Sequence, residues 1–245
     1  MAAEPLKKTK PAAFWPFAFG IVLITEVVLH LIPAFAYLTL YTKPMLMPLL
    51  ITWVFVSQKS RAYPTPKNKK LYLLLIIGLV FGWAGDIILM FSHPLAFPAG
   101  IAAFLTNHIF YILLFTGLAQ NTQIRALPVA VIAIYVIAFC AMLWPALGML
   151  KIPVIIYGVV IGTMVLVALS LKKLPKPTCK IQIVTGAALF VLSDSILALH
   201  RFGFTVKFAD SIIMLTYGLA QFMIVKGVLE GLESSDEHAI ATPVE

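Results

Sequence analysis

The chain has 245 residues, of which 61% are hydrophobic and only 11% are charged, and its mean hydropathy is +1.00. Soluble domains have about 45–50% apolar and about 25% charged residues, so this composition excludes an ordinary soluble protein and predicts several membrane spans. The formal net charge of +8 does not indicate a nucleic-acid partner, because the basic residues lie in short gaps between apolar runs. The two cysteines, Cys140 and Cys179, lack the spacing of a zinc site or a disulfide framework.

Eight apolar runs are long enough to cross a bilayer, which takes about 20 helical residues. They predict an all-α bundle of eight transmembrane helices at residues 14–32, 38–57, 71–91, 98–119, 126–146, 152–171, 181–199 and 208–229. The first run follows a basic segment, as a signal peptide does. However, Glu26 interrupts it and it exceeds the usual ~7–15 apolar residues, so we expect a retained span. Lys43, Pro44 and Pro48 interrupt the second run, which we expect to be kinked or partly re-entrant.

The basic residues divide unequally between the two ends of this predicted bundle. Most lie before the first span, in the gaps after even-numbered spans, or at the end of the last span. The other side holds only Lys43, Lys151, Arg201 and Lys207. The positive-inside rule therefore places both termini in the cytoplasm. Around the membrane domain of residues 14–229, we expect a basic amino-terminal segment at 1–13 and an acidic, disordered tail at 230–245.

Two aspartates lie in matching contexts within the predicted spans, Asp86 in Gly-Asp-Ile-Ile-Leu and Asp194 in Ser-Asp-Ser-Ile-Leu. A charged carboxylate at the centre of a membrane helix costs about 2.5–3.5 kcal/mol on insertion scales, so such residues are functional candidates. The topology places both at a similar depth, in the outer half of the membrane. Gly78 and Gly82 share a helical face with Asp86, which predicts that this face packs against another helix. The alternative is a structural role, in which each carboxyl group only bonds a neighbouring helix.

Other polar side chains of the spans could complete a site. His108 and Tyr111 are three residues apart on one face of the fourth span, with Asn107 adjacent but turned aside. Tyr217 and Gln221 are four residues apart on one face of the eighth span. The alternative is hydrogen bonding between helices, which stabilises membrane proteins by about 0.6 kcal/mol per bond on average.

Four more charged or titratable residues have less specific contexts. Lys43 is the basic residue deepest in apolar sequence, where it can pair with an aspartate, hold a phosphate or extend to the interface. Glu26 and His30, four residues apart in the first span, are expected to form a structural pair. Asp210 is expected at the start of the last helix.

Five segments occur in the order seen in the lysoplasmalogenase family of YhhN-like multi-pass membrane proteins, and the chain resembles that family over about residues 40–226. The segments are Thr42-Lys43-Pro44, Gly85-Asp86-Ile87-Ile88-Leu89, His108-Ile109-Phe110-Tyr111, Ser193-Asp194-Ser195-Ile196-Leu197-Ala198 and Tyr217-Gly218-Leu219-Ala220-Gln221. The resemblance implies an ether hydrolase that cleaves the sn-1 vinyl-ether bond of a lysoplasmalogen. The products would be a fatty aldehyde and glycerophosphoethanolamine or glycerophosphocholine.

This resemblance implies that Asp86 and Asp194 are the catalytic pair. The substrate-binding residues would be Lys43, Asn107, His108, Tyr111, Ser193, Tyr217 and Gln221. Vinyl-ether hydrolysis needs a carboxylic acid that protonates carbon and a second carboxylate that steadies the cation and activates water, and it requires no metal or cofactor. Burial and a nearby like charge both favour the neutral form of a carboxyl group. The less polar neighbours of Asp86 favour it as the acid, although the sequence leaves both assignments open.

Two other functions are compatible with the same residues. A small-solute or proton-coupled transporter also uses paired membrane carboxylates, and a lipid-binding scaffold would use them only to hold helices together. As a hydrolase, the protein would have a lysophospholipid and water as its substrates and the lipid bilayer as its environment. The membrane would be the inner or plasma membrane in a bacterium and the endoplasmic reticulum in a eukaryote. Its oligomeric state is left open.

Overall fold

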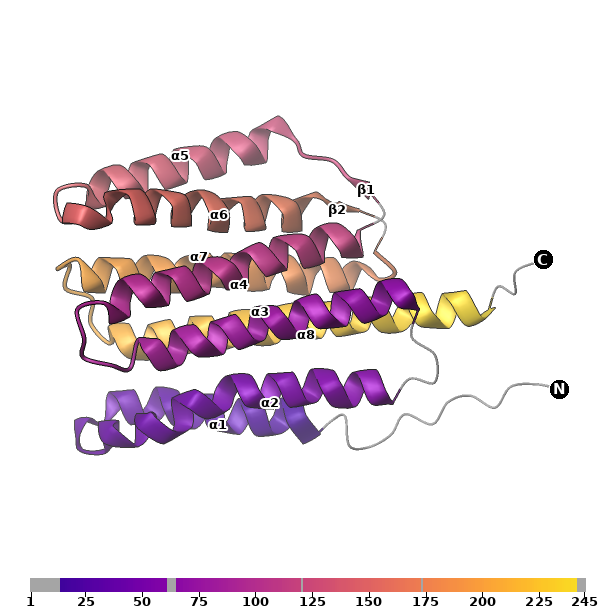
Figure 1. The fold of residues 1–245 in the computed structure, drawn as a ribbon, viewed down its shortest axis with the longest axis horizontal. Coiled ribbons are helices and arrows are strands. Elements are labelled where there is room, and N and C mark those ends of the chain that lie inside the picture. The colour runs from indigo at the N-terminus through magenta and orange to yellow at the C-terminus, as the bar shows by residue number, and fades with distance from the viewer. Residues whose placement is uncertain (1–13, 61–64, 120, 173, 242–245) are drawn as a thin grey trace.

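The computed structural model describes residues 14–60, 65–119, 121–172 and 174–241. Within these ranges, eight helical segments have the length and apolar composition needed to cross a membrane, and they run side by side (Figure 1). Their helices are α1 (Phe14–Leu31), α2 (Thr39–Lys59), α3 (Pro66–Ile88), α4 (Ala96–Leu118), α5 (Ala126–Leu143), α6 (Lys151–Ser170), α7 (Pro177–Arg201) and α8 (Ala209–Ala241). The prediction of an all-α, eight-span, multi-pass membrane protein is therefore confirmed.

Short elements join some of these helices. The 3-10 turns η2 (Pro33–Leu38) and η3 (Gly148–Leu150) lead directly into α2 and α6. Strands β1 (Asn121–Thr122) and β2 (Leu171–Lys172) pair antiparallel, with Asn121 opposite Lys172, and link the connections that follow α4 and α6. The sequence did not predict this pair, because two residues carry too little pattern to be recognised as a strand.

The helices form hairpins around a central α8. Helix α8 packs against α7 most extensively and also contacts α1, α2 and α4, while α3 packs against α4. The α1–α2 pair lies at one edge of the bundle and the α5–α6 pair at the other (Figure 1). Helix α1 begins and α8 ends at the same end of the bundle, as an even number of spans requires (Figure 1). The placement of that end in the cytoplasm remains a prediction.

Helix α2 is continuous through both of its prolines, so the expected re-entrant segment is not present. Pro48 has no N–H to donate to the carbonyl of Pro44 one turn earlier. That carbonyl instead accepts a 2.9 Å hydrogen bond from the indole Nε1 of Trp83 in α3. The Thr52 hydroxyl donates to the Pro48 carbonyl at 2.7 Å. These side chains supply hydrogen bonds around the proline sites, which allows a helix with two prolines to span the membrane.

Helix α8 extends well beyond the end predicted for the last span. It is helical to Ala241, so the tail expected to be disordered from Glu230 is helical as far as Ala241. The buried apolar face continues through Val228, Leu229 and Leu232, which keeps this turn of the helix packed against the bundle. The expected basic segment 1–13 and residues 242–245 lie outside the described residues.

Candidate active site

Asp86 is almost completely buried and is held by a tyrosine from another helix. The residue is 2% exposed, and its carboxylate accepts a 2.7 Å hydrogen bond from the hydroxyl of Tyr217 in α8. The Tyr217 oxygen accepts in turn from Nε2 of Gln221 at 3.4 Å, and Oε1 of Gln221 accepts from the hydroxyl of Tyr111 in α4. The donors therefore all point towards Asp86 in a chain that joins α4, α8 and α3.

The glycine face of α3 makes room for this chain. A Cβ atom at Gly78 would lie 2.9 Å from the Tyr111 ring, and one at Gly82 would lie 3.0 Å from Nε2 of Gln221. Asn107 bonds the same face, because its Nδ2 donates to the Gly78 carbonyl at 2.7 Å. The prediction that this face packs against protein is confirmed. The Asn107 side chain therefore hydrogen-bonds the backbone of α3 and not the carboxyl group of either aspartate.

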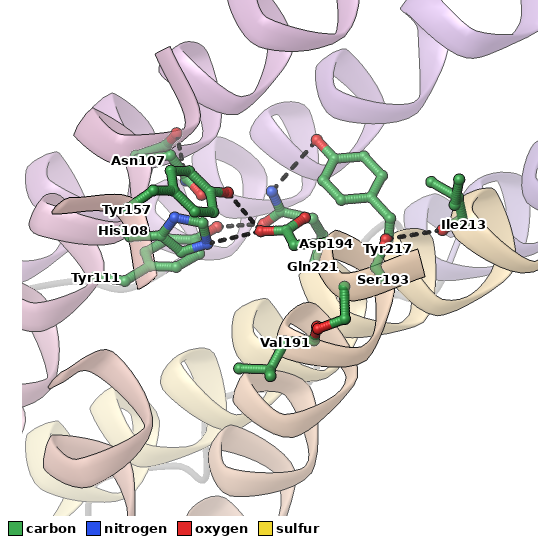
Figure 2. Close-up of polar contacts among 12 residues, drawn as sticks. Asn107, His108, Tyr111, Tyr157, Val191, Ser193, Asp194, Ile213, Tyr217 and Gln221 are labelled. Carbon is green, nitrogen blue, oxygen red and sulfur yellow. Dashed lines mark hydrogen bonds and ion pairs between the residues drawn. The ribbon is translucent and has the colours of Figure 1, made fainter. Parts of the chain in front are cut away.

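Asp194 lies on α7 in a more open position, with its side chain 14% exposed. Its Oδ2 atom accepts a hydrogen bond from the hydroxyl of Tyr157 in α6. Nε2 of His108 lies 3.9 Å from the same oxygen and has no hydrogen-bond partner among the described residues, although the histidine is fully buried. Figure 2 shows the Tyr157 and His108 side chains directed at the carboxylate.

Aromatic packing connects the surroundings of the two aspartates. The Phe190 ring makes edge-to-face contacts with His108, at a centroid distance of 4.6 Å, and with Tyr217, at 5.4 Å. Phe190 thus lies between His108, which is beside Asp194, and Tyr217, which is bonded to Asp86. The two aspartates therefore belong to one region with two different sets of hydrogen-bond donors. Within the part of the chain that is described, no cluster of three or more His, Cys, Asp or Glu could hold a metal.

Asp194 also lines an apolar cavity between α4, α5, α6 and α7, whose volume of about 760 Å³ includes the part that is open to the surroundings. We call it the apolar cavity; Phe104, Phe139, Ile161 and Val191 are typical of its walls. Its hydroxyl groups come from Tyr157, Tyr135 and Ser195. Ser195 donates to the Val191 carbonyl at 2.6 Å, so the Tyr135 hydroxyl is the donor in its 2.6 Å bond to Ser195. An apolar cavity with a few convergent polar groups is typical of a small-molecule site.

A second hollow lies where α7 ends and α8 begins, opposite the carboxy-terminal end of α8, and its volume of about 1240 Å³ includes the part that is open to the surroundings. It has a charged lining, and we call it the polar hollow. Its titratable residues are His30, Lys43, His93, Arg201 and Asp210. Among the described residues Lys43 therefore lines this hollow and forms no direct ion pair with Asp86 or Asp194.

The structure thus brings most of the predicted site residues together. The residues around the two aspartates are His108, Tyr111, Tyr217 and Gln221. Ser193 is not hydrogen-bonded to either aspartate in the described part of the chain. Its hydroxyl donates a 3.1 Å hydrogen bond to the Ile213 carbonyl and so links α7 to α8. Glu26 is fully buried, bonded by His30 at 3.1 Å and by the Thr42 hydroxyl, in agreement with a structural pair.

Two tyrosines of the cavity were missed by sequence reasoning. Tyr157 and Tyr135 are each the single polar side chain in a strongly apolar stretch of sequence. The sequence shows only that a buried tyrosine hydroxyl needs a hydrogen-bond partner. The sequence does not identify that partner, because only the tertiary structure shows that α5 and α6 lie beside α7.

Comparisons with known proteins point to one family. The model of the YhhN family matches residues 38–228. A human protein named Lysoplasmalogenase TMEM86A is 26% identical over 201 residues, which cover 79% of this chain and 80% of that protein. A Mycobacterium bovis protein named Lysoplasmalogenase is 30% identical over 195 residues, which cover 77% of this chain and 72% of that protein. No solved structure matches the chain.

Proposed function

The chain belongs to the YhhN family, and on that premise we propose that it is a lysoplasmalogenase, a membrane hydrolase that cleaves the sn-1 vinyl-ether bond of a lysoplasmalogen. The names of its relatives support this substrate class. The observation that carries the proposal is the position of Asp194, a partly buried carboxyl group in the wall of an apolar cavity, with Asp86 in the same region. The apolar wall suits a hydrocarbon chain, and a carboxyl group in that wall would lie beside the bond next to the chain.

The reaction begins with proton transfer from a neutral carboxyl group to the β-carbon of the vinyl ether. The double-bond electrons form the new C–H bond, and the ether oxygen shares the positive charge of the resulting oxocarbenium ion. Water adds to the α-carbon and loses a proton to a carboxylate, which gives a hemiacetal. The hemiacetal then collapses: its hydroxyl loses a proton as the C=O bond forms, the C–O bond to the glycerol breaks, and the glycerol oxygen takes up a proton. The products are an aldehyde and glycerophosphoethanolamine or glycerophosphocholine, and the reaction neither consumes nor releases protons overall.

We assign the acid to Asp194. It lines the apolar cavity, whereas Asp86 is not among the residues of that wall. Tyr157 donates to Oδ2 of Asp194, so a proton on this carboxyl group resides on Oδ1, the oxygen left free to meet the substrate. This assignment reverses the one favoured by the polarity of sequence neighbours, because the local cavity decides which carboxyl group the substrate meets.

Asp86 is then the ionised partner. Its bond from Tyr217 can stabilise a charged carboxylate, as the bond from Tyr157 can at Asp194, so the division of roles rests on the cavity wall, which contains Asp194 and not Asp86. A fixed negative charge in this region stabilises the oxocarbenium ion, by the same logic that pairs two carboxyl groups in glycoside hydrolysis. Asp86 accepts the proton from water, either directly or through the Tyr217 hydroxyl.

The test is aldehyde release from lysoplasmenylethanolamine by the purified protein in detergent. Asp194→Asn and Asp86→Asn keep the size of each side chain and remove its acid–base function, so each should lower kcat by about 10²–10⁴-fold. Glu233→Gln is the matched control, because Glu233 lies on α8 beyond the site and outside both cavities. Near-normal turnover by either aspartate variant would overturn the two-carboxylate mechanism.

Transport by paired carboxylates is the rival hypothesis, and the lining of the cavity argues against it. The wall around Asp194 is largely apolar, which suits a hydrocarbon chain better than a hydrophilic solute. A hydrolase forms aldehyde in detergent without any membrane gradient. A transporter moves an unchanged solute across sealed liposomes and forms no aldehyde.

A further inference from the structure

The polar hollow contains charges of both signs from different elements of the fold. Lys43 comes from α2, Arg201 from the last turn of α7 and Asp210 from the first turn of α8. Among the described residues, no direct ion pair joins Asp210 to either cation. The guanidinium of Arg201 lies 4.9 Å from the centroid of the Phe97 ring. Two cations and one carboxylate therefore face the hollow without neutralising each other.

The polar hollow adjoins the apolar cavity. Leu89, Phe97 and Leu197 line both spaces, so three side chains form the boundary between them. Phe97 lines the apolar cavity, and its ring also makes a cation–π contact with the guanidinium group of Arg201. The two spaces are therefore adjacent, and an amphipathic molecule with its chain beside Asp194 and its charged end among Lys43, Arg201 and Asp210 would pass between these three side chains.

We propose that the polar hollow binds a zwitterionic phospho-amine headgroup, with the phosphate at Lys43 and Arg201 and the ammonium at Asp210. This inference rests on the proposed function and deepens it, because it assigns the phosphate and the amine of the headgroup to named residues of the hollow. Arginine and lysine are the usual protein partners of phosphate groups, and a carboxylate pairs with an ammonium group. A phosphate monoester without an amine would leave Asp210 unpaired and facing a like charge, so Asp210 selects against it.

Asp210 also has a local role that the test must separate from ligand binding. An acidic residue in the first turn of a helix interacts favourably with the helix dipole, by about 0.3–1 kcal/mol. Its loss would weaken α8 slightly and would affect every ligand alike. Only a change that depends on the headgroup identifies Asp210 as a contact for the ammonium group.

The experiment measures direct binding of two lysolipids with a saturated sn-1 ether, which the hydrolase cannot cleave. One is 1-O-alkyl-glycero-3-phosphoethanolamine and the other is 1-O-alkyl-glycero-3-phosphate. Asp210→Asn should weaken binding of the phosphoethanolamine lipid about 5–10-fold and should leave binding of the monoester unchanged or tighter. Asp210→Glu keeps the negative charge and should retain the wild-type preference. Arg201→Gln should weaken both lipids. Lys151→Gln is its matched control, because Lys151 lies over the Trp144 ring and does not line the hollow.

The possible outcomes separate this inference from the proposed function. If Asp210→Asn weakens both lipids equally, or neither, the headgroup assignment is wrong. If Arg201→Gln alters binding no more than Lys151→Gln does, the phosphate assignment is wrong. A wild-type protein that prefers the phosphoethanolamine lipid but releases no aldehyde from its vinyl-ether analogue would support this headgroup site and overturn the hydrolase.

Discussion

The hydroxyl of Tyr217 donates a 2.7 Å hydrogen bond to the carboxylate of Asp86, between helices whose residues are 131 positions apart in sequence. The Tyr217 ring also makes edge-to-face contacts with Phe104 and Phe190, at centroid distances of 5.8 and 5.4 Å. The ring therefore contributes to packing, while the hydroxyl contributes to the charge state and orientation of Asp86. A substitution that removes only the oxygen separates these two contributions.

Tyr217→Phe should lower kcat with little effect on thermal unfolding. The aromatic contacts remain, but the bond to a charged carboxylate, worth about 1.5–3 kcal/mol, is lost. If that bond is made mainly in the transition state, the loss corresponds to about 10–100-fold in rate. The measurement is kcat for aldehyde release together with the unfolding temperature in detergent. Tyr41→Phe is the control, because Tyr41 is 69% exposed on the outside of the bundle; equal rates in the two variants would exclude a role for the bond.

The fold was largely predictable from sequence, because membrane spans depend on local composition. The two aspartates and the glycine face of Gly78 and Gly82 were found in the same way, since a charge and a small-residue stripe are conspicuous in apolar sequence. Tyr157 was missed because its hydroxyl gains meaning only from the packing of α6 beside α7. The assignment of Asp194 to the cavity wall likewise depends on tertiary structure, which residue spacing does not encode.

Gly78→Ala should destabilise the protein and reduce its activity. The new methyl group would lie 2.9 Å from the Tyr111 ring, so Tyr111 or α3 must move, and overpacking of this kind costs about 1–3 kcal/mol. Movement of Tyr111 would also break its bond to Gln221 at the start of the donor chain. Thermal unfolding and aldehyde release measure the two effects.

Gly20→Ala is the matched control for this substitution. A methyl group at Gly20 of α1 would meet nothing within 4 Å, so only the higher helix propensity of alanine should act. We expect unchanged or slightly higher stability and unchanged turnover. Equal unfolding temperatures for the two variants would show that the Gly78 site can absorb a methyl group.

Trp83→Phe should lower the stability of the protein without removing a group that touches the substrate cavity. Phenylalanine keeps most of the apolar surface but cannot donate to the Pro44 carbonyl, which Pro48 already leaves without its helical partner. An unpaired buried acceptor costs about 1–3 kcal/mol. Trp144→Phe is the comparison, because Trp144 is 46% exposed and its ring mainly supports Lys151. We expect a clearly larger fall in unfolding temperature for Trp83→Phe, and an equal fall would contradict the proposed role of the indole N–H.

The orientation of the bundle can be tested with single cysteines at its two ends. Met149, which is 97% exposed, lies in the connection between α5 and α6, at the end opposite the carboxy-terminal end of α8. Ser60 follows α2 at the end that is rich in lysine and arginine, where positive-inside places the cytoplasm. In a Cys140→Ser, Cys179→Ser background, Met149→Cys should react with a membrane-impermeant maleimide in intact cells. Ser60→Cys should react only after permeabilisation. The reverse pattern would place the polar hollow, and the headgroup it is proposed to bind, on the cytoplasmic side.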